Sequence, residues 1–524
     1  MSAAWSGTPA KTEQPERSGY DGLRRSLGLR DLVVYGLLFI APMAPVGVFG
    51  ALDAQSGGAV PLVYLIATVA MGFTAYSYIR MVRAVPQAGS VYAYAGAGLG
   101  RGAGFVAGWM AMLDYLLIPA VGYLFSGIAM NQLVPSVDQW IWTAVAVVVT
   151  TALNLSGVRR AAVVGFAVLV MEIVVLLVFV AAALVVLARH GAERDWLSPL
   201  TGDGSGFGLA AVMGAVSVAV LSFLGFDAIA NFAEEAVGGR EGGSSLVAKA
   251  LLGCLVLAGV LFIAQTYLAA LLSQLSSADL AADPGSQGDA FYTAVQASVG
   301  GWLQTVVAVS KAIGAAFAAL AGQAAAGRLL YAMARDRRLP GALAKVNGPS
   351  GVPRRTVLLS AVITMCAAVW AARADSGLDR LVSVVDIGAL TAFALLHLSV
   401  IGYYGVRRRT AVDGGSGGAG GSGGSGGVFG NWAVPLVGLA ITIAVIVTAH
   451  REAHIVGVVW LAAGLLALLA LRLRGRDDGA ADSGLGSGPE PRSGSGSGSG
   501  SDRTSGTGPG GDSGGSHRGV SGGD

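Results

Sequence analysis

Ionisable side chains inside long apolar runs are the residues of this sequence that could do chemistry. Glu172 lies within VLVMEIVVLLVF, and Asp227 follows directly after SFLGF at 222–226. A charge in the hydrocarbon layer is costly, so each carboxylate is a candidate for a substrate or ion path. We predict that Asp227 faces a substrate path, the alternative being a helix-end cap that accepts a freed backbone N–H. We predict that Glu172 binds and releases a proton, the alternative being a buried structural hydrogen bond.

Further ionisable residues occur within the apolar runs or near their ends. Asp114 and Tyr115 lie in GWMAMLDYLLIP and could line the same path. Asp386 begins a later run, where a solvated helix end is expected and a cavity wall is the alternative. Lys311, in VAVSKAIGAAF, could pair with one of these carboxylates or extend to the membrane surface. His397 is expected to be a core histidine with satisfied hydrogen bonds.

Two of the apolar runs are interrupted near their middles. The first contains FIAPMAPVG at 39–47, where Pro42 and Pro45 each remove a backbone donor. The second contains Gly225 beside Asp227. An isolated kink is the alternative for each break, but corresponding breaks in two halves of a chain indicate a substrate site. The predicted substrate-binding residues are Ala41, Pro42, Met43, Ala44, Pro45, Asp114, Tyr115, Ser222, Phe223, Gly225, Phe226 and Asp227.

The length and composition of the chain indicate that transmembrane helices position these residues. The chain has 524 residues, of which 54% are hydrophobic and 12% are charged. Long apolar runs in such a chain predict an all-α polytopic membrane protein with about twelve transmembrane helices. The expected spans are 32–52, 60–83, 103–134, 140–157, 160–188, 209–235, 246–273, 302–333, 356–373, 379–404, 432–449 and 454–473. The glycine-rich segment 84–100 is too short to span and is expected to form a re-entrant or interfacial hairpin.

The basic residues of the short connections fall on one side of these spans. They include Arg80 and Arg83, Arg159 and Arg160, and the run 407–409, whereas the opposite loops are mixed or acidic. By the positive-inside rule, both termini are cytoplasmic. The net charge is only +3, and no basic surface for a nucleic acid is expected. We also expect no metal, no cofactor and no catalytic residue.

Four stretches resemble the amino acid-polyamine-organocation superfamily, and within it the putrescine-importer-like and actinobacterial permeases. They are FIAPMAPVG, VPQAGSVYAY, SFLGFDAIANFAEE and RLLYAMARDRRLP. The resemblance implies the leucine-transporter fold, with two inverted five-helix repeats, two extra helices and a substrate held between helices one, three, six, eight and ten. It also implies that proton-coupled relatives hold a lysine at the position of Glu172.

The resulting organisation has six parts. They are a disordered cytoplasmic N-terminus at 1–30, inverted repeats at 31–208 and 209–410, a Gly/Ser loop at 411–431, two further spans at 432–474 and a disordered cytoplasmic tail at 475–524.

The function predicted from this resemblance is that of a secondary active transporter in the cytoplasmic membrane. It would import amino acids or polyamines by alternating access, with the proton as coupling ion. The alternatives are an exchanger of the same fold and a membrane sensor or scaffold that binds without transporting. A membrane enzyme ranks behind both, because the sequence has no H-E-x-x-H zinc pattern and no lysine in a phosphate-loop motif.

The excess of acids over bases within the spans favours a cationic substrate. The prolines weaken carboxylate recognition, although N–H groups at Ala41, Met43 and Ala44 remain. Phe223, Phe226 and Tyr115 could stack on an alkyl-ammonium chain, with ordinary packing as the alternative. Glu234 and Glu235 lie at the end of span six. One interpretation is a gate or salt bridge with nearby arginines, and the alternative is a solvated helix end.

Overall fold

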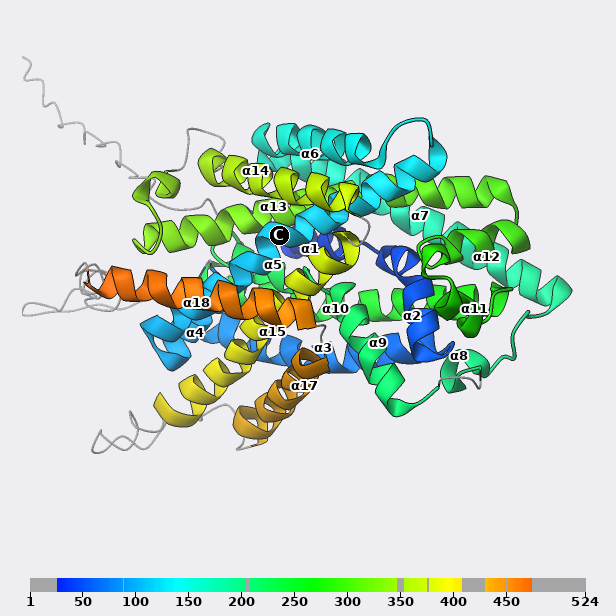
Figure 1. Ribbon diagram of the computed structural model, residues 1–524. Coiled ribbons are helices and arrows are strands. Elements are labelled where there is room, and N and C mark those ends of the chain that lie inside the picture. The colour runs from blue at the N-terminus through cyan, green and yellow to red at the C-terminus, as the bar shows by residue number, and fades with distance from the viewer. Residues whose placement is uncertain are drawn as a thin grey trace, which may run out of the picture. The chain divides into compact units, whose positions relative to one another are not determined.

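The described part of the chain is helical. This computed structural model describes residues 26–87, 89–203, 207–345, 353–374, 377–407, 429–448 and 451–473, and no β-strand occurs among them. Eleven helices in these ranges are long and apolar enough to cross a membrane, and Gln139–Leu155 is a shorter apolar helix. The all-α polytopic fold is therefore confirmed (Figure 1). Most of the predicted N-terminal segment 1–30, most of the loop 411–431 and the whole tail 475–524 lie outside the described residues.

The first half of the chain begins with an interrupted helix and ends after the fifth apolar helix. Its elements are α1 (Leu29–Ile40), the 3₁₀ turn η1 (Ala44–Gly47), α2 (Phe49–Ser56), α3 (Val60–Ala84), α4 (Val91–Leu99), α5 (Arg101–Leu133), α6 (Gln139–Leu155), α7 (Val158–His190) and α8 (Ser198–Thr201).

The second half begins in the same way. Its elements are α9 (Leu209–Leu221), the 3₁₀ segment η2 (Phe226–Phe232), α10 (Gly239–Leu272), α11 (Ser277–Ala282), η3 (Pro284–Ser286), α12 (Ala290–Ser298), α13 (Gly301–Arg335), η4 (Gly341–Ala344), α14 (Arg354–Arg373), α15 (Gly377–Val400), the π-helical segments η5 (Ile401–Arg407) and η6 (Phe429–Ala433), α17 (Val434–Thr448) and α18 (Arg451–Leu473).

Both predicted helix breaks are present. In the first span α1 ends at Ile40, Ala41 has a positive φ of 58°, and η1 starts after Met43. Pro42 and Pro45 cannot donate backbone hydrogen bonds, so a continuous α-helix cannot form there. The second half of this span is α2, which is separate from α1 in Figure 1.

A glycine makes the second break possible. Gly225 has a φ of 109°, a conformation that is costly for residues with a side chain. A Cβ at this position would lie 2.7 Å from the ring of Phe39, so the two breaks touch each other here. Because Gly225 packs against Phe39, the loops and half-helix ends of the two breaks lie together.

The segment 84–100 contains one short helix, α4, which packs against α5 and α15. Its re-entrant or interfacial placement stays a prediction. A Cβ at Gly98 would lie 2.7 Å from Ser399 Cα, so the glycine permits close contact with the end of α15. The glycines that argued against a spanning helix therefore serve helix packing.

His397 is a core histidine, as predicted. It is fully buried on α15, and its Nδ1 lies 2.9 Å from the Ser77 hydroxyl of α3. This contact ties the two helices together without involving the breaks.

Candidate functional site

A cavity of about 70 Å³ lies between the two helix breaks. It is bounded by the first span, α5, the end of α9 and α13. Three of the predicted substrate-binding residues line it: Ala41, Ala44 and Ser222. Its other lining residues are Phe39, Ile40, Val48, Ile118, Val121, Gly122, Phe125, Leu221, Leu224, Lys311, Ala315, Ala318 and Ala319. The wall is therefore mainly apolar, with one ammonium group and one hydroxyl.

Lys311 connects α13 to the first break. Its Nζ donates hydrogen bonds to the carbonyl oxygens of Met43, at 3.1 Å, and Ala44, at 3.3 Å. It also lies 5.1 Å from the centre of the Phe125 ring, within cation–π range. Carbonyls released by a broken helix need a donor, and this buried lysine supplies it. Lys311 thus lies within the fold and does not extend to a membrane surface.

Glu172 lies on α7 where this helix contacts α13, the helix that carries Lys311. It is fully buried and packs against Gly314, one helical turn after Lys311 on α13, and its charge interacts with that of Lys311. Neither carboxylate oxygen has a hydrogen-bond partner among the described residues. The alternative of a satisfied structural hydrogen bond is therefore not what the structure contains.

The backbone of the first break is already largely occupied. The N–H of Ala41 donates to Leu37 and that of Ala44 donates to Ala41, so only Met43 of the three predicted donors has no acceptor among the described residues. The carbonyl of Pro42 accepts a hydrogen bond of 2.9 Å from Gln265 of α10. Gln265 was not predicted, although a glutamine inside an apolar span is a usable signal.

Asp227 is buried and is not among the residues that line the cavity. Its carboxylate accepts hydrogen bonds from Tyr115 at 2.5 Å, Tyr78 at 3.2 Å and the backbone N–H of Gly225 at 3.2 Å. Asn231 donates in turn to the Tyr115 hydroxyl. This geometry matches the helix-end cap that was the alternative interpretation of Asp227.

The predicted aromatic residues beside the second break pack against other rings. Phe226 lies edge-on to Tyr78 with ring centres 5.9 Å apart, and Phe223 contacts Phe262 at 5.0 Å. Both phenylalanines are buried and absent from the cavity wall, as are Tyr115 and Gly225. Ser222 remains at the wall, where its hydroxyl lies 2.9 Å from the Tyr64 hydroxyl.

Asp386 does not form the predicted solvated helix end. Only 8% of it is exposed, because α2, α9 and α17 surround this part of α15 and enclose a second cavity that Asp386 lines. Asp114 is also buried, with 3% exposed, and does not line the first cavity.

One end of the first span is held by the Arg328 clasp, which consists of Arg328 and Glu235. Their side chains form two hydrogen bonds of 2.6 and 3.3 Å, and less than a tenth of each side chain is exposed. The carbonyl of Glu235 accepts the backbone N–H groups of Ser26 and Leu27, directly before α1. Arg335 pairs with Glu234 nearby at 3.1 Å. The predicted ion pairs with arginines are therefore present, and Glu235 is not a solvated helix end.

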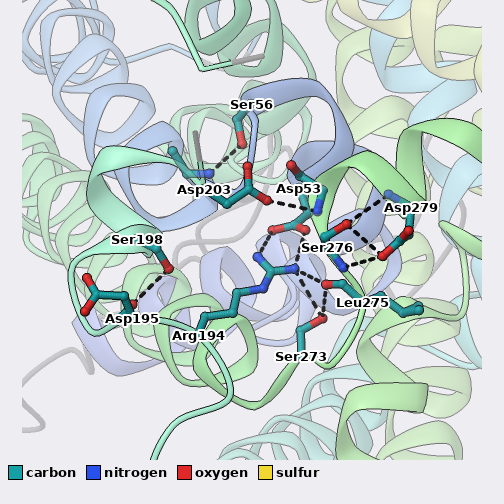
Figure 2. Close-up of polar contacts among 12 residues, drawn as sticks. Asp53, Ser56, Arg194, Asp195, Ser198, Asp203, Ser273, Leu275, Ser276 and Asp279 are labelled. Carbon is teal, nitrogen blue, oxygen red and sulfur yellow. Dashed lines mark hydrogen bonds and ion pairs between the residues drawn. The ribbon is translucent and has the colours of Figure 1, made fainter. Parts of the chain in front are cut away.

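The other end of this span is held by the Arg194 clasp, which consists of Arg194, Asp53, Ser273 and Leu275. Figure 2 shows the guanidinium of Arg194 paired with both carboxylate oxygens of Asp53, at 3.0 and 2.8 Å. The same guanidinium donates to Ser273 and to the carbonyl of Leu275, after the end of α10. Neither Arg194 nor Asp53 was predicted, because each lies at the end of a run and no spacing links them.

Polar contacts also fix α11 beside this clasp. Ser276 donates to the carboxylate of Asp279 from its hydroxyl at 2.7 Å and from its backbone N–H at 3.0 Å (Figure 2). These hydrogen bonds hold the pKa of Asp279 below its usual value. The first turn of α11 is thereby capped next to α2.

Comparison with known proteins places the chain among transporters. The sequence profile described as amino acid permease matches residues 32–470. The chain is 28% identical to the low-affinity putrescine importer PlaP of Escherichia coli over 448 residues, which cover 85% of this chain and 93% of the relative.

Two relatives from Bacillus subtilis have nearly the same sequence identity to this chain. The chain is 27% identical to the branched-chain amino acid permease BcaP over 73% of this chain and 82% of the relative. It is 27% identical to a methylthioribose transporter over 76% of this chain and 86% of the relative. The substrates that give these relatives their names differ, so the comparisons indicate a class of small solutes and no single compound.

Proposed function

Since the chain belongs to the amino acid permease family, we propose that it imports amino acids or organic amines together with protons across the cytoplasmic membrane. The similarity to a putrescine importer and to a branched-chain amino acid permease supports this substrate class. Transport would proceed by alternating access, with the cavity between the two breaks as the substrate site.

The contact of Lys311 with the first break is the observation that carries the proposal. Its ammonium holds the carbonyls of Met43 and Ala44, while Glu172 lies on the facing helix without a hydrogen-bond partner among the described residues. A proton gained or lost by this pair changes the charge that holds the break. Protonation would thereby alter the position of α1 and α2 beside the substrate.

The cavity supports a small substrate with an alkyl portion. Phe39, Val121 and Leu221 provide apolar contact, and the ring of Phe125 could face an ammonium group. The present volume of about 70 Å³ is roughly half of the 150 Å³ that accommodates benzene in an engineered cavity. Binding of an amino acid would therefore require the clasped halves to separate slightly.

The two clasps fit the gates of such a cycle. With both termini cytoplasmic, as the arginine distribution predicts, the Arg328 clasp would close the cytoplasmic side. The Arg194 clasp would then close the outer side. Opening one while the other stays closed would expose the cavity to one side only.

Uptake into proteoliposomes tests the proposal. The full-length protein is reconstituted, and initial uptake of radiolabelled putrescine and leucine is measured with and without an inward proton gradient. We expect wild type to accumulate at least one of them severalfold in a gradient-dependent manner. The Glu172→Gln variant should retain exchange of labelled for unlabelled substrate and lose the response to the gradient.

Glu193→Gln is the matched control, because Glu193 is an exposed acid just beyond the end of α7. It should accumulate substrate as wild type does. Gradient-independent exchange by wild type would favour the exchanger, and binding without any flux would favour the sensor. A normal gradient response in Glu172→Gln would disprove the coupling role of Glu172.

A further inference from the structure

A second cavity, of about 370 Å³, lies on the face where α2 ends. Its volume falls in the range of about 300 to 1,000 Å³ that is typical of small-molecule sites. It includes Gln55 of α2, which is two residues from Asp53 of the Arg194 clasp. The elements around it are α2, α9, α11, α15 and α17, and α2, α9 and α11 lie near one another in Figure 1.

Asp386 is the one ionisable residue among those lining this cavity. Its side chain is more than nine-tenths buried, and its Oδ1 has no hydrogen-bond partner among the described residues. A buried carboxylate oxygen without a partner is costly, and the cost is offset when a cation binds the carboxylate.

Asp114 adds a second carboxyl group behind the wall. A Cβ at Gly388 would lie 3.1 Å from the backbone N of Asp114, so α15 and α5 are in close contact two residues after Asp386. Asp114 also has an Oδ1 without a partner in the described part of the chain. A cation bound beside these two carboxyl groups would favour their ionised forms.

The neutral polar groups on the wall can also accept hydrogen bonds. The Ser217 hydroxyl donates its proton to the Gly214 carbonyl at 2.6 Å, so its oxygen can accept in the cavity. The Gln287 amide nitrogen donates to the Leu280 carbonyl at 2.9 Å, which leaves its side-chain oxygen as an acceptor. An ammonium group has three donors and no acceptor, and it therefore complements this wall.

We propose that this cavity binds the ammonium group of a primary amine or amino acid, with the Asp386 carboxylate as its ionic partner. The site is separate from the cavity at the helix breaks, and no residue lines both. Amine binding at this site does not depend on the proposed function. The part that the site would play in import rests on that proposal. In an importer with cytoplasmic termini, this site would be the first to meet an external substrate.

Equilibrium binding of putrescine and butylamine to the purified full-length protein tests the site without any proton gradient. The Asp386→Asn variant removes the charge at nearly constant size. We expect its affinity for both amines to fall at least tenfold, while Asp386→Glu should retain most of the affinity. A merely structural role of Asp386 would not predict rescue by the longer acid.

Asp195→Asn is the matched control. Asp195 is exposed, lies one residue after Arg194, and accepts a backbone N–H of Leu197 that asparagine can also accept. Its amine affinity should equal that of wild type. Unchanged affinity in Asp386→Asn, or no amine binding by wild type, would overturn the proposed site.

A labelling experiment tests the site with Asp386 intact, in case Asp386→Asn does not fold. Ser383 lines the same cavity and is replaced by cysteine in a Cys366→Ser background, because Cys366 is exposed. We expect a cationic methanethiosulfonate to react at least tenfold faster than an anionic one, and putrescine to slow the reaction. Equal rates for the two reagents, or no protection by putrescine, would contradict the proposal.

The outcomes separate this inference from the proposed function. Amine binding that depends on Asp386, together with no gradient-driven uptake, would retain the site and reject the transporter. Gradient-driven uptake with amine binding that is independent of Asp386 would retain the transporter and reject the site.

Discussion

At the scale of single residues, the charges within the spans have different surroundings. Lys311 of α13 donates hydrogen bonds to the carbonyls of the first break. Glu172 packs against α13 as well, and its carboxylate has no hydrogen-bond partner among the described residues. Asp227, in contrast, accepts three hydrogen bonds and stabilises the second break. A buried charge therefore indicates a functional region, but its neighbours determine which role it can have.

Replacing Asp227 by asparagine should weaken the second break. The amide nitrogen would replace an oxygen that accepts from Tyr115 and Tyr78, so we expect a loss of about 1 to 3 kcal/mol of stability. Uptake of putrescine and leucine should fall to a similar extent, because Asp227 does not line the cavity. Thermal unfolding and proteoliposome uptake measure the two effects. Selective loss of putrescine uptake with normal stability would instead support direct contact between Asp227 and a cation.

At the scale of elements, the breaks depend on each other. The positive φ of Gly225 places the backbone against Phe39, and α10 and α13 supply Gln265 and Lys311 to the carbonyls of the first break. Carbonyls of the first break are thus satisfied by two other helices. These tertiary contacts add to the hydrogen bonds that the broken segment makes within itself.

Gly225→Ala should disrupt this arrangement. A left-handed conformation costs a residue with a Cβ about 1 to 2 kcal/mol, and the added carbon would also collide with the ring of Phe39. We expect a lower melting temperature and strongly reduced uptake. Gly214→Ala is the control within α9, because a Cβ there meets nothing within 4 Å. It should leave stability unchanged or raise it by up to about 1 kcal/mol.

At the scale of the whole described unit, a cluster with a buried ion pair lies at each end of the interrupted first span. The Arg328 clasp joins the turn after η2 to α13 next to the start of α1, and the Arg194 clasp joins the end of α2 to the segment after α10. Removing one partner of a buried ion pair typically costs about 3 to 5 kcal/mol. Because each clasp stabilises one closed end, their loss should favour opposite open conformations.

Hydrogen–deuterium exchange on the reconstituted protein tests this expectation. Arg194→Gln should raise exchange in α2 and α11, and Arg328→Gln should raise it in α1 and η2. The variant Arg189→Gln is a control, because Arg189 lies on an exposed part of α7 outside both clasps. An identical exchange pattern in the two clasp variants would argue against separate gates.

Three of the twelve predicted substrate-binding residues line the cavity, and the contacts that connect distant residues could not be predicted from local sequence. The apolar runs, the two breaks and the buried Glu172 follow from composition and from the chemistry of proline and glycine. The prediction for Asp386 was wrong because its position near a span end suggested water, whereas neighbouring helices cover it. The polar residues Gln265 and Arg328 had a detectable signal, since both lie inside apolar runs.

The sequence by itself determined that the protein is a helical membrane protein with two interrupted spans, because hydrophobic length and missing backbone donors act within one segment. Only the tertiary structure decided which charges meet. Arg194 and Asp53 are 141 positions apart, and Lys311 reaches a break 267 residues earlier in the chain. Such contacts depend on how each helix is rotated and packed against its neighbours, and no local pattern specifies that rotation.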